Sequence, residues 1–187
     1  NINESTSIKT ILSVQATKGG TQLDTLGFDT DGTILPDSKY RYYTSDSKEI
    51  KYSASIHLNK KINKRNNYVI GAYYDLYKIK FIDSVFKNTP DFIGYEKNID
   101  VNGQIPIIRG YAQWQHRFSN KLTLNTGLYS QYVQINKEAT LEPRLGVKYK
   151  ISEKQIISAG YGMHSQMQPR LYYFKQKRLP DGSYVLT

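Results

Sequence analysis

The chain contains no cysteine among its 187 residues. This absence excludes a disulfide-stabilised scaffold and any metal site built on thiolate ligands. No stretch approaches the ~20 consecutive apolar residues that a membrane-spanning helix requires, and the mean hydropathy is −0.59. Phenylalanine and tryptophan are scarce, with 6 residues and 1 residue, whereas tyrosine is abundant with 17. Rings with a polar tip therefore supply most of the aromatic surface.

The chain also lacks the signatures of a nucleic-acid-binding protein, although its formal net charge is +10. The sequence holds neither the aromatic motif of an RNA-recognition domain nor a recognition helix, and its basic residues are dispersed. We therefore expect no nucleic-acid partner. Positive charge is concentrated in Lys175, Lys177 and Arg178 near the end, and in one short turn with Lys60, Lys61, Lys64 and Arg65. We expect this cluster to serve solubility or to contact membrane phosphates at a rim.

No arrangement of residues typical of an enzyme is present. His57, His116 and His164 fall on separate predicted strands, without acidic residues at ligand spacing. A Gly-x-Ser-x-Gly elbow is lacking. Residues 29–32 (DTDG) lack the further carboxylates and the closing glutamate of a calcium loop, so we expect a solvated turn there. The sequence predicts neither catalytic residues nor a metal or cofactor.

What the chain does have is an alternation of apolar and polar residues with period two. Ile8, Leu12 and Val14 would share one face of a strand, while Lys9 and Ser13 take the other. The same pattern occurs in residues 50–58, 68–76, 108–118, 122–132, 145–151 and 157–163. We therefore predict an all-β protein with about seven or eight antiparallel strands.

The predicted connections between these strands differ in length. The short ones are Lys60–Asn67, Ser119–Lys121 and Ser152–Lys154, and the long ones are Lys18–Glu49 and Asp83–Ile105. Short and long connections alternate strictly up to Asn136. Such alternation is typical of a transmembrane barrel, which has short periplasmic turns and long external loops. A crossing strand needs roughly 9 to 11 residues, and the predicted strands have about that length.

The two predicted faces differ in charge. The apolar sets carry almost none, whereas the opposite sets are rich in Lys, Arg, Gln, Ser and Asn. The tyrosines predicted on the apolar side are Tyr52, Tyr68, Tyr74, Tyr132 and Tyr149. Several of them lie near strand ends, where barrels carry aromatic girdles. In water the apolar face would be buried, whereas in lipid it would point outward around a wet lumen. Composition alone leaves both interpretations open.

An ordered set of short motifs extends from Pro106 onward. They are YAQWQHRF (111–118), LTLNTGLYSQYV (122–133), LEPRLGVKYKIS (141–152) and IISAGYGMHSQMQP (156–169). This order resembles the barrel of TonB-dependent outer-membrane receptors, particularly those of Bacteroidetes-type bacteria. The first 105 residues resemble the family only in their general pattern and not in specific motifs.

The resemblance implies a barrel of about 22 strands, plugged by an N-terminal domain through which a TonB-type protein energises import. Residues 1–187 are then a single segment of the barrel wall. We expect a fragment without the plug, because the segment contains no such domain and does not end on the aromatic residue that closes a native barrel. The implied location is the outer membrane of a Gram-negative bacterium. The implied partners are lipid and a nutrient ligand, which is a siderophore, glycan or peptide.

Ligand contacts in that family come from external loops, the plug and the upper lumen wall. The candidate ligand-binding residues are Tyr40, Tyr42 and Tyr43 in the first predicted long loop, and Gln166, Arg170, Tyr172 and Tyr173 after the Gly-Tyr-Gly strand. Aromatic rings beside arginine and glutamine suit stacking on sugars or contacts with peptides and siderophores. Packing of these rings within a loop or a girdle is the competing interpretation.

Two further functions fit the same pattern. One is a soluble all-β module that binds carbohydrate or protein, and the other is a small, complete eight-stranded outer-membrane barrel. The residues that discriminate between lipid and water are Leu12, Ile56, Ile70, Trp114, Leu124 and Val147. An outward band of these side chains favours lipid, and a dry interior built from them favours a soluble module.

Overall fold

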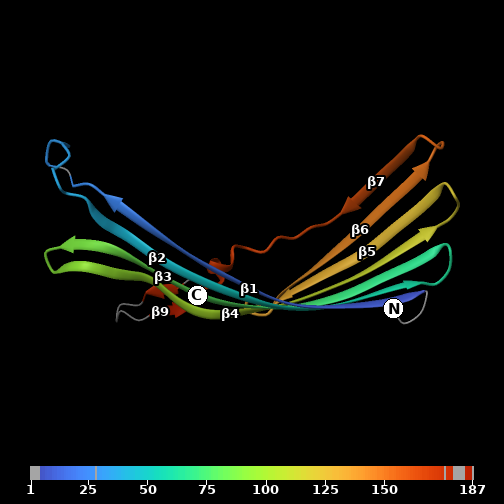
Figure 1. Ribbon diagram of the computed structural model, residues 1–187, viewed down its shortest axis with the longest axis horizontal. Helices are drawn as coiled ribbons and strands as arrows, with labels where there is room; N and C mark the ends of the chain where they lie inside the picture. The colour runs from blue at the N-terminus through green and yellow to red at the C-terminus, as the bar shows by residue number, and fades with distance from the viewer. Residues whose placement is uncertain (1–4, 28, 175, 179–183, 187) are drawn as a thin grey trace. The chain divides into compact units, whose positions relative to one another are not determined.

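The computed structural model describes residues 5–27, 29–174, 176–178 and 184–186. Its main element is a seven-stranded antiparallel sheet whose strands pair in chain order (Figure 1). The strands are β1 (Thr6–Thr25), β2 (Tyr40–Lys61), β3 (Asn66–Thr89), β4 (Phe92–Arg117), β5 (Leu122–Val133), β6 (Glu138–Lys150) and β7 (Ile156–Gly162). The predicted all-β class, the antiparallel pairing and the number of strands are confirmed.

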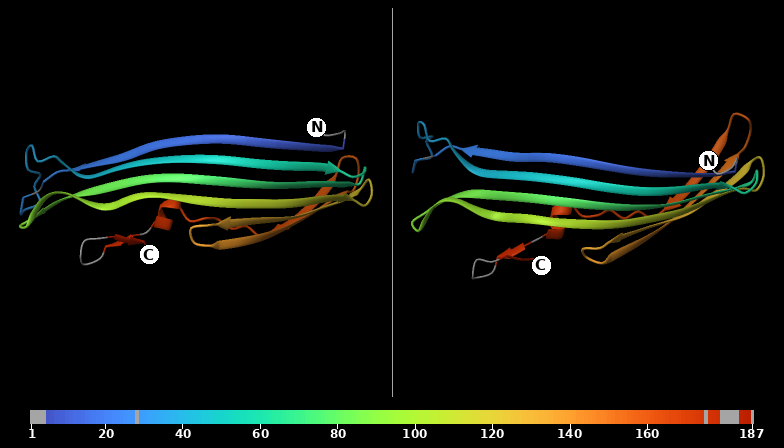
Figure 2. Two further views of the ribbon diagram at one scale, coloured as in Figure 1. Left: turned by 90° about the horizontal axis from the view of Figure 1, so that it is seen from below. Right: turned by 60° about the horizontal axis from the view of Figure 1, so that its bottom comes forward.

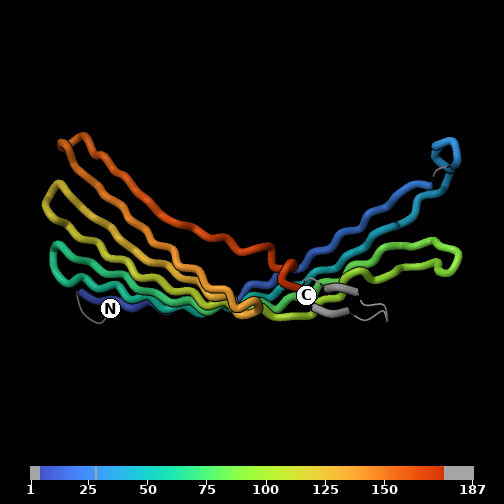
Figure 3. Tube along the Cα trace, turned by 180° about the vertical axis from the view of Figure 1, so that it is seen from behind, coloured from blue at the N-terminus to red at the C-terminus, as the bar shows by residue number. Residues whose placement is uncertain are grey.

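A short 3-10 helix, η1 (Arg170–Phe174), follows the sheet. The segments β8 (Gln176–Arg178) and β9 (Tyr184–Leu186) then pair as a separate two-stranded sheet. The succession of hairpins can be followed along the chain in Figures 2 and 3. Within the described residues the main sheet is open, with β1 and β7 as its edge strands.

The chain divides into two compact units. Unit 1 comprises residues 1–14, 52–76 and 105–173, and unit 2 comprises residues 15–51, 77–104 and 174–187. The strands β1 to β4 are 20, 22, 24 and 26 residues long and contribute to both units. The shorter strands β5, β6 and β7 belong to unit 1 alone.

The connections between strands contradict the predicted alternation of short and long links. The predicted long loop 83–105 is wrong, because these residues continue β3 and β4 and the chain reverses at Pro90 and Asp91. The loop predicted for residues 18–49 shrinks to 26–39, since β1 runs on to Thr25 and β2 begins at Tyr40. The polar composition of these strand extensions resembled that of loops, although the backbone stays extended. The remaining turns, 62–65, 118–121, 134–137 and 151–155, are short.

The register of β4 to β7 sorts the side chains onto two faces. One row across the four strands contains His116, Leu124, Val147 and Ala159, and the next contains Gln115, Asn125, Gly146 and Gly160. Successive rows lie on opposite faces because side chains alternate along each strand. We call the first the apolar face and the second the polar face. The predicted alternation is confirmed for these strands.

The apolar face is largely exposed in unit 1. Leu12 is 78% exposed, Ile56 50% and Ile70 48%. Val147 is also exposed, and Trp114 and Leu124 are half-buried. None of these six discriminating residues belongs to a dry core. Exposed apolar residues are common singly, but a face built of them is unusual for a water-soluble domain.

The buried side chains include charged ones. The buried residues of unit 1 are Asp75, Ile105, Ile107, Val133 and Glu142, and those of unit 2 are Ile79, Asp83, Val101 and Phe174. Carboxylates are rarely buried in folded proteins unless they are paired. Within unit 1, two buried carboxylates, Asp75 and Glu142, occur together with a bare apolar face, which is the inverse of a soluble sheet.

Unit 2 is held by contacts between rings and by one close approach. The Phe86 ring contacts the rings of Tyr40 and Tyr95, each with a centroid separation of 5.5 Å. The Phe174 ring lies against Gly103 of β4, where any Cβ would overlap it. The end of η1 is therefore fixed against β4.

Candidate functional site

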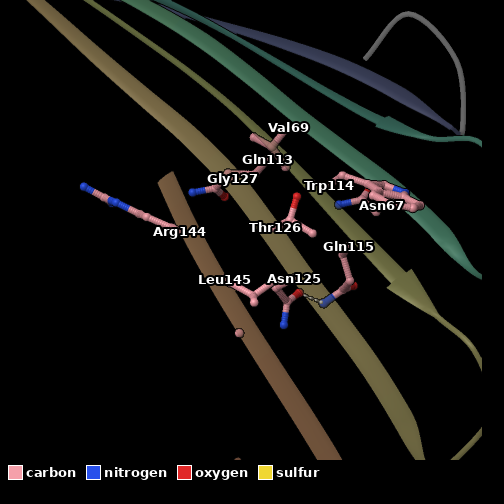
Figure 4. Close-up of a pocket in the computed structure, with 11 residues that line it drawn as sticks. Asn67, Val69, Gln113, Trp114, Gln115, Asn125, Thr126, Gly127, Arg144 and Leu145 are labelled. Atoms are coloured by element: carbon pink, nitrogen blue, oxygen red, sulfur yellow. Dashed lines mark hydrogen bonds between the residues drawn. The ribbon is translucent and has the colours of Figure 1, made fainter. Parts of the chain in front are cut away.

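A hollow of about 380 Å³ lies on the polar face of unit 1, over β3 to β6 (Figure 4). Its amide side chains are Asn67, Gln113, Gln115 and Asn125, and Gly127 and Gly146 leave the space open. Gln115 Nε2 donates a hydrogen bond to Asn125 Oδ1 at 3.0 Å. Amides offer both donors and acceptors, and Arg144 also lines the hollow, so this surface suits a polar ligand such as a sugar or a peptide.

A buried ion pair joins β3 and β4 on the polar face. Arg109 Nη2 pairs with Asp75 Oδ2, and the side chains are 27% and 2% exposed. The hydroxyl of Ser53 in β2 donates to Asp75 Oδ1. The guanidinium also lies over the Tyr73 ring, 5.7 Å from its centroid. These contacts join β2, β3 and β4. A shift of register would leave a buried charge without its partner, which costs several kcal/mol, so the contacts favour one register.

A cluster of polar-tipped rings lies on the same strands. His57 Nδ1 is 3.0 Å from Tyr111 Oη, and His57 Nε2 is 3.1 Å from Ser55 Oγ. The His57 and Tyr73 rings meet edge to face at 5.0 Å. The Tyr111 ring covers Gly71 on the neighbouring strand, where a Cβ would overlap the ring. The glycine therefore serves a close approach of a ring to the backbone.

Glu142 of β6 fixes the segment that follows β7. Its Oε1 accepts hydrogen bonds from the Ser165 backbone N–H at 3.0 Å and from the Ser165 hydroxyl at 2.5 Å. Its Oε2 accepts a hydrogen bond from Arg144 Nη2 at 3.1 Å and lies 3.9 Å from His164 Nδ1. Sequence reasoning placed His164 on a strand, but β7 ends at Gly162. Residues that are distant in sequence thus converge on one carboxylate.

The tyrosines predicted to bind ligand from a long loop lie in β2 instead. Tyr40, Tyr42 and Tyr43 open that strand in unit 2. Tyr43 Oη lies 3.4 Å from the buried Asp83 Oδ2, whereas Tyr40 packs on Phe86 and is exposed, as is Tyr42. Neighbouring residues of a strand point to opposite faces, so the three rings do not converge.

The second predicted group belongs to unit 1. Gln166 lies in the extended segment after β7, and Arg170, Tyr172 and Tyr173 lie in η1. Tyr172 is 69% exposed, and its backbone N–H donates to the Pro169 carbonyl at 2.9 Å. Tyr172 is therefore available to a partner. A ligand-binding role for both groups stays a prediction.

A row of rings follows the apolar face where β3 and β4 meet their short turns. Tyr68 stacks on Trp114 at 6.1 Å, Trp114 meets His116 at 5.3 Å, and His116 meets Phe118 at 4.5 Å. Asn66 Oδ1 accepts a hydrogen bond from Trp114 Nε1 at 3.0 Å and lies 2.7 Å from His116 Nδ1. We call these four rings the aromatic ladder. One amide oxygen thus serves both Trp114 Nε1 and His116 Nδ1.

The acidic segment 29–33 forms a closed turn. Asp29 Oδ1 accepts hydrogen bonds from the backbone N–H groups of Asp31 at 3.0 Å and Thr33 at 2.8 Å, and Gly32 has a φ of 81°. The carboxylate thus serves the turn itself. Across the part of the chain that the structure describes, no group of three or more His, Asp or Glu side chains is placed to hold a metal ion.

At the end of β1, next to the 26–39 link, Asp24 accepts a hydrogen bond from Arg41 Nε at 3.1 Å. Lys39 Nζ lies 3.4 Å from the same carboxylate. The hydrogen bond from Arg41, assisted by Lys39, holds the pKa of Asp24 below its usual value. Both cations are largely exposed, so this pair contributes little to stability.

Within the described ranges, no helix combines the length and the apolar content that crossing a membrane demands. Comparison with known protein families gives no match, and comparison with curated proteins gives none either.

Proposed function

We propose that this sheet is part of the wall of an outer-membrane β-barrel, and that the protein is a TonB-dependent receptor that imports a nutrient ligand. One observation carries the proposal. The apolar face is exposed, while buried charged side chains such as Asp75 and Glu142 lie on the polar face. A sheet between lipid and a wet lumen needs this arrangement, because lipid covers the apolar side chains and the lumen accommodates the charges.

The extent of the apolar face supports lipid as its solvent. Monomeric soluble proteins rarely expose a contiguous apolar patch larger than a few hundred Å². In unit 1 large apolar residues are exposed on β1, β2, β3, β6 and β7, including Leu12, Ile70 and Tyr161. In water such a face would draw a covering layer or a second copy of the chain. Lipid provides the cover for every strand at once.

Strand length and ring position also support a crossing. The strands β5 and β6 have 12 and 13 residues, which suffices for the roughly 9 to 11 residues of a tilted crossing. The aromatic ladder lies at one end of the apolar face, where a girdle meets the headgroups.

The receptor role rests on the family resemblance and on the polar face. The amide-lined hollow suits a glycan, a peptide or the polar groups of a siderophore. Tyr172 in unit 1, and separately Tyr40 and Tyr42 in unit 2, are exposed rings of the kind that stacks on a ligand. Import requires a plug and a TonB-type energising protein, and we include both in the proposal as partners of the whole protein.

The test uses the intact native protein. Outer-membrane fractionation, detergent-dependent extraction and a gel-mobility shift on boiling are expected for a barrel. Release as a detergent-free monomer would contradict the barrel and favour a soluble all-β binding module. Folding of residues 1–187 alone into a heat-modifiable species would favour a small complete barrel. Uptake of the ligand that disappears when the energising protein is deleted separates import from passive binding.

A further inference from the structure

A second hollow, of about 530 Å³, lies at the end of β2, β3 and β4 that carries the 62–65 turn. Four cationic side chains line it, those of Lys61, Lys64, Arg65 and Arg117. The amides beside them include Asn67 and Gln115. We call this feature the basic hollow. Its volume is within the usual range for a small-molecule site.

Strand geometry brings these cations together. Arg117 shares the polar face with Gln115 because the two are separated by two residues in β4. The Arg117 backbone N–H donates to the Arg65 carbonyl at 2.8 Å, so the last residue of β4 lies beside the turn that precedes β3. Across β5 and β6 the same row continues through Thr123 to Lys148, a further cation. The positive charge thus forms a band across the polar face.

The turn that carries two of the cations is well defined. Asn63 Oδ1 accepts hydrogen bonds from the backbone N–H groups of Arg65 and Asn66, each at 2.8 Å, and from Asn66 Nδ2 at 3.0 Å. Asn66 in turn binds the aromatic ladder. Lys64 and Arg65 are therefore presented from a fixed turn rather than from a long loop.

Carboxylates are missing from this region of the described chain. No Asp or Glu is among the residues that line the basic hollow, and none of its four cations forms an ion pair with a described carboxylate. The nearby cation Lys150, in contrast, is paired with Glu153 at 2.7 Å. Like charges gathered without partners repel one another, and a bound anion relieves that repulsion.

We propose that the basic hollow binds a small ligand that carries at least two negative oxyanion charges, on phosphate or carboxylate groups. Arginine presents donors in a planar fork that matches both groups bidentately, and the lysines add charge. The neighbouring amides donate further hydrogen bonds to the same oxygens. This binding site is an addition to the receptor role and is independent of whether the apolar face lies in lipid.

The experiment is calorimetric titration of the intact native protein in a zwitterionic detergent. The probes are inorganic pyrophosphate and tricarballylate, which present phosphate and carboxylate charges respectively. We expect saturable binding of at least one probe, and the preferred probe identifies the chemical class. Arg117→Gln or Arg65→Gln should weaken binding by about tenfold, which is typical of losing one charge-assisted hydrogen bond. Affinity should also fall as salt is raised.

Lys154→Gln is the matched control, because it removes one positive charge from the neighbouring 151–155 turn outside the hollow. It should change the affinity by less than about twofold. Unchanged heat-modifiable gel migration shows that a variant has folded, and Lys64→Gln in the exposed turn replaces any arginine variant that has not. Absence of binding to both probes, equal loss in the control, or binding to anionic vesicles alone would overturn the proposal. Pyrophosphate binding by a protein released in soluble form would overturn the barrel and leave this site standing.

Discussion

Arg109 of β4 pairs with Asp75 of β3 on the polar face, where the Asp75 side chain is 2% exposed. The residue before Asp75 in the chain, Tyr74, is 45% exposed on the apolar face. One step along the strand therefore separates a buried charge from a bare ring. Two neighbouring positions thus show the inverted arrangement of the sheet, with charge buried and apolar surface exposed. The stability of the fold should therefore depend strongly on the ion pair.

Replacing Arg109 by leucine should destabilise the folded protein by about 3–5 kcal/mol, because the Asp75 carboxylate stays buried without its cation. The measurement is urea unfolding of the native protein in lipid vesicles. The double variant Asp75→Asn with Arg109→Leu should recover most of that loss. A single variant that costs less than about 1 kcal/mol would place the pair in a solvated setting.

Gly71→Ala should destabilise the sheet by about 1–3 kcal/mol, because the added methyl group would overlap the Tyr111 ring. Displacing that ring also breaks its contact with His57. Gly110→Ala is the matched control, since its Cβ would approach only the Gly71 carbonyl oxygen, at 3.8 Å. Equal unfolding free energies for the two variants would show that the ring does not rest on Gly71.

Trp114 is the single tryptophan of the 187 residues and reports on the aromatic ladder. With the protein in bilayers of brominated lipids, we expect its fluorescence to be quenched more by bromines near the headgroups than by bromines at the chain ends. The Trp114 signal is obtained as the difference from Trp114→Phe. Quenching by neither lipid would remove the ladder from the membrane boundary.

Glu142→Gln should speed hydrogen exchange at the Ser165 amide by about five- to tenfold, because a neutral acceptor holds that N–H less strongly than a carboxylate. Exchange measured by mass spectrometry over residues 163–169 tests this. Glu138→Gln is the control, since its carboxylate accepts from Asn136 and is exposed. An unchanged rate in Glu142→Gln would show that other contacts fix the segment.

The number of strands and the identity of their faces followed from the sequence, because period two reports the two environments of a strand directly. The strand ends did not. The predicted Lys18–Glu49 link includes Gly20, yet a Cβ on Gly20 would lie 2.8 Å from the Ser45 carbonyl oxygen, so the glycine serves a close approach of β1 and β2. The Pro90–Asp91 step is a turn signal that would have located the β3–β4 reversal.

The period-two pattern could not predict which residues contact one another on the polar face. Arg109 was assigned to the polar side, but its partner Asp75 lies on another strand, and pairing two strands requires their register. Likewise, the sequence places His57 on a strand without acidic residues at ligand spacing, and its contact with Tyr111 across the sheet needs the register. Periodicity assigns a face to each residue, and only the register assigns its neighbours.

The central claim is that lipid covers the apolar face and water wets the polar face, and single-cysteine labelling along β5 tests it most directly. The chain has no native cysteine to interfere. In intact outer membranes, a water-soluble maleimide should modify Asn125→Cys and Gln131→Cys but leave Leu124→Cys and Leu128→Cys unmodified, while detergent-denatured samples of all four react. Equal labelling at all four positions, or labelling of the two leucine positions alone, would contradict the account.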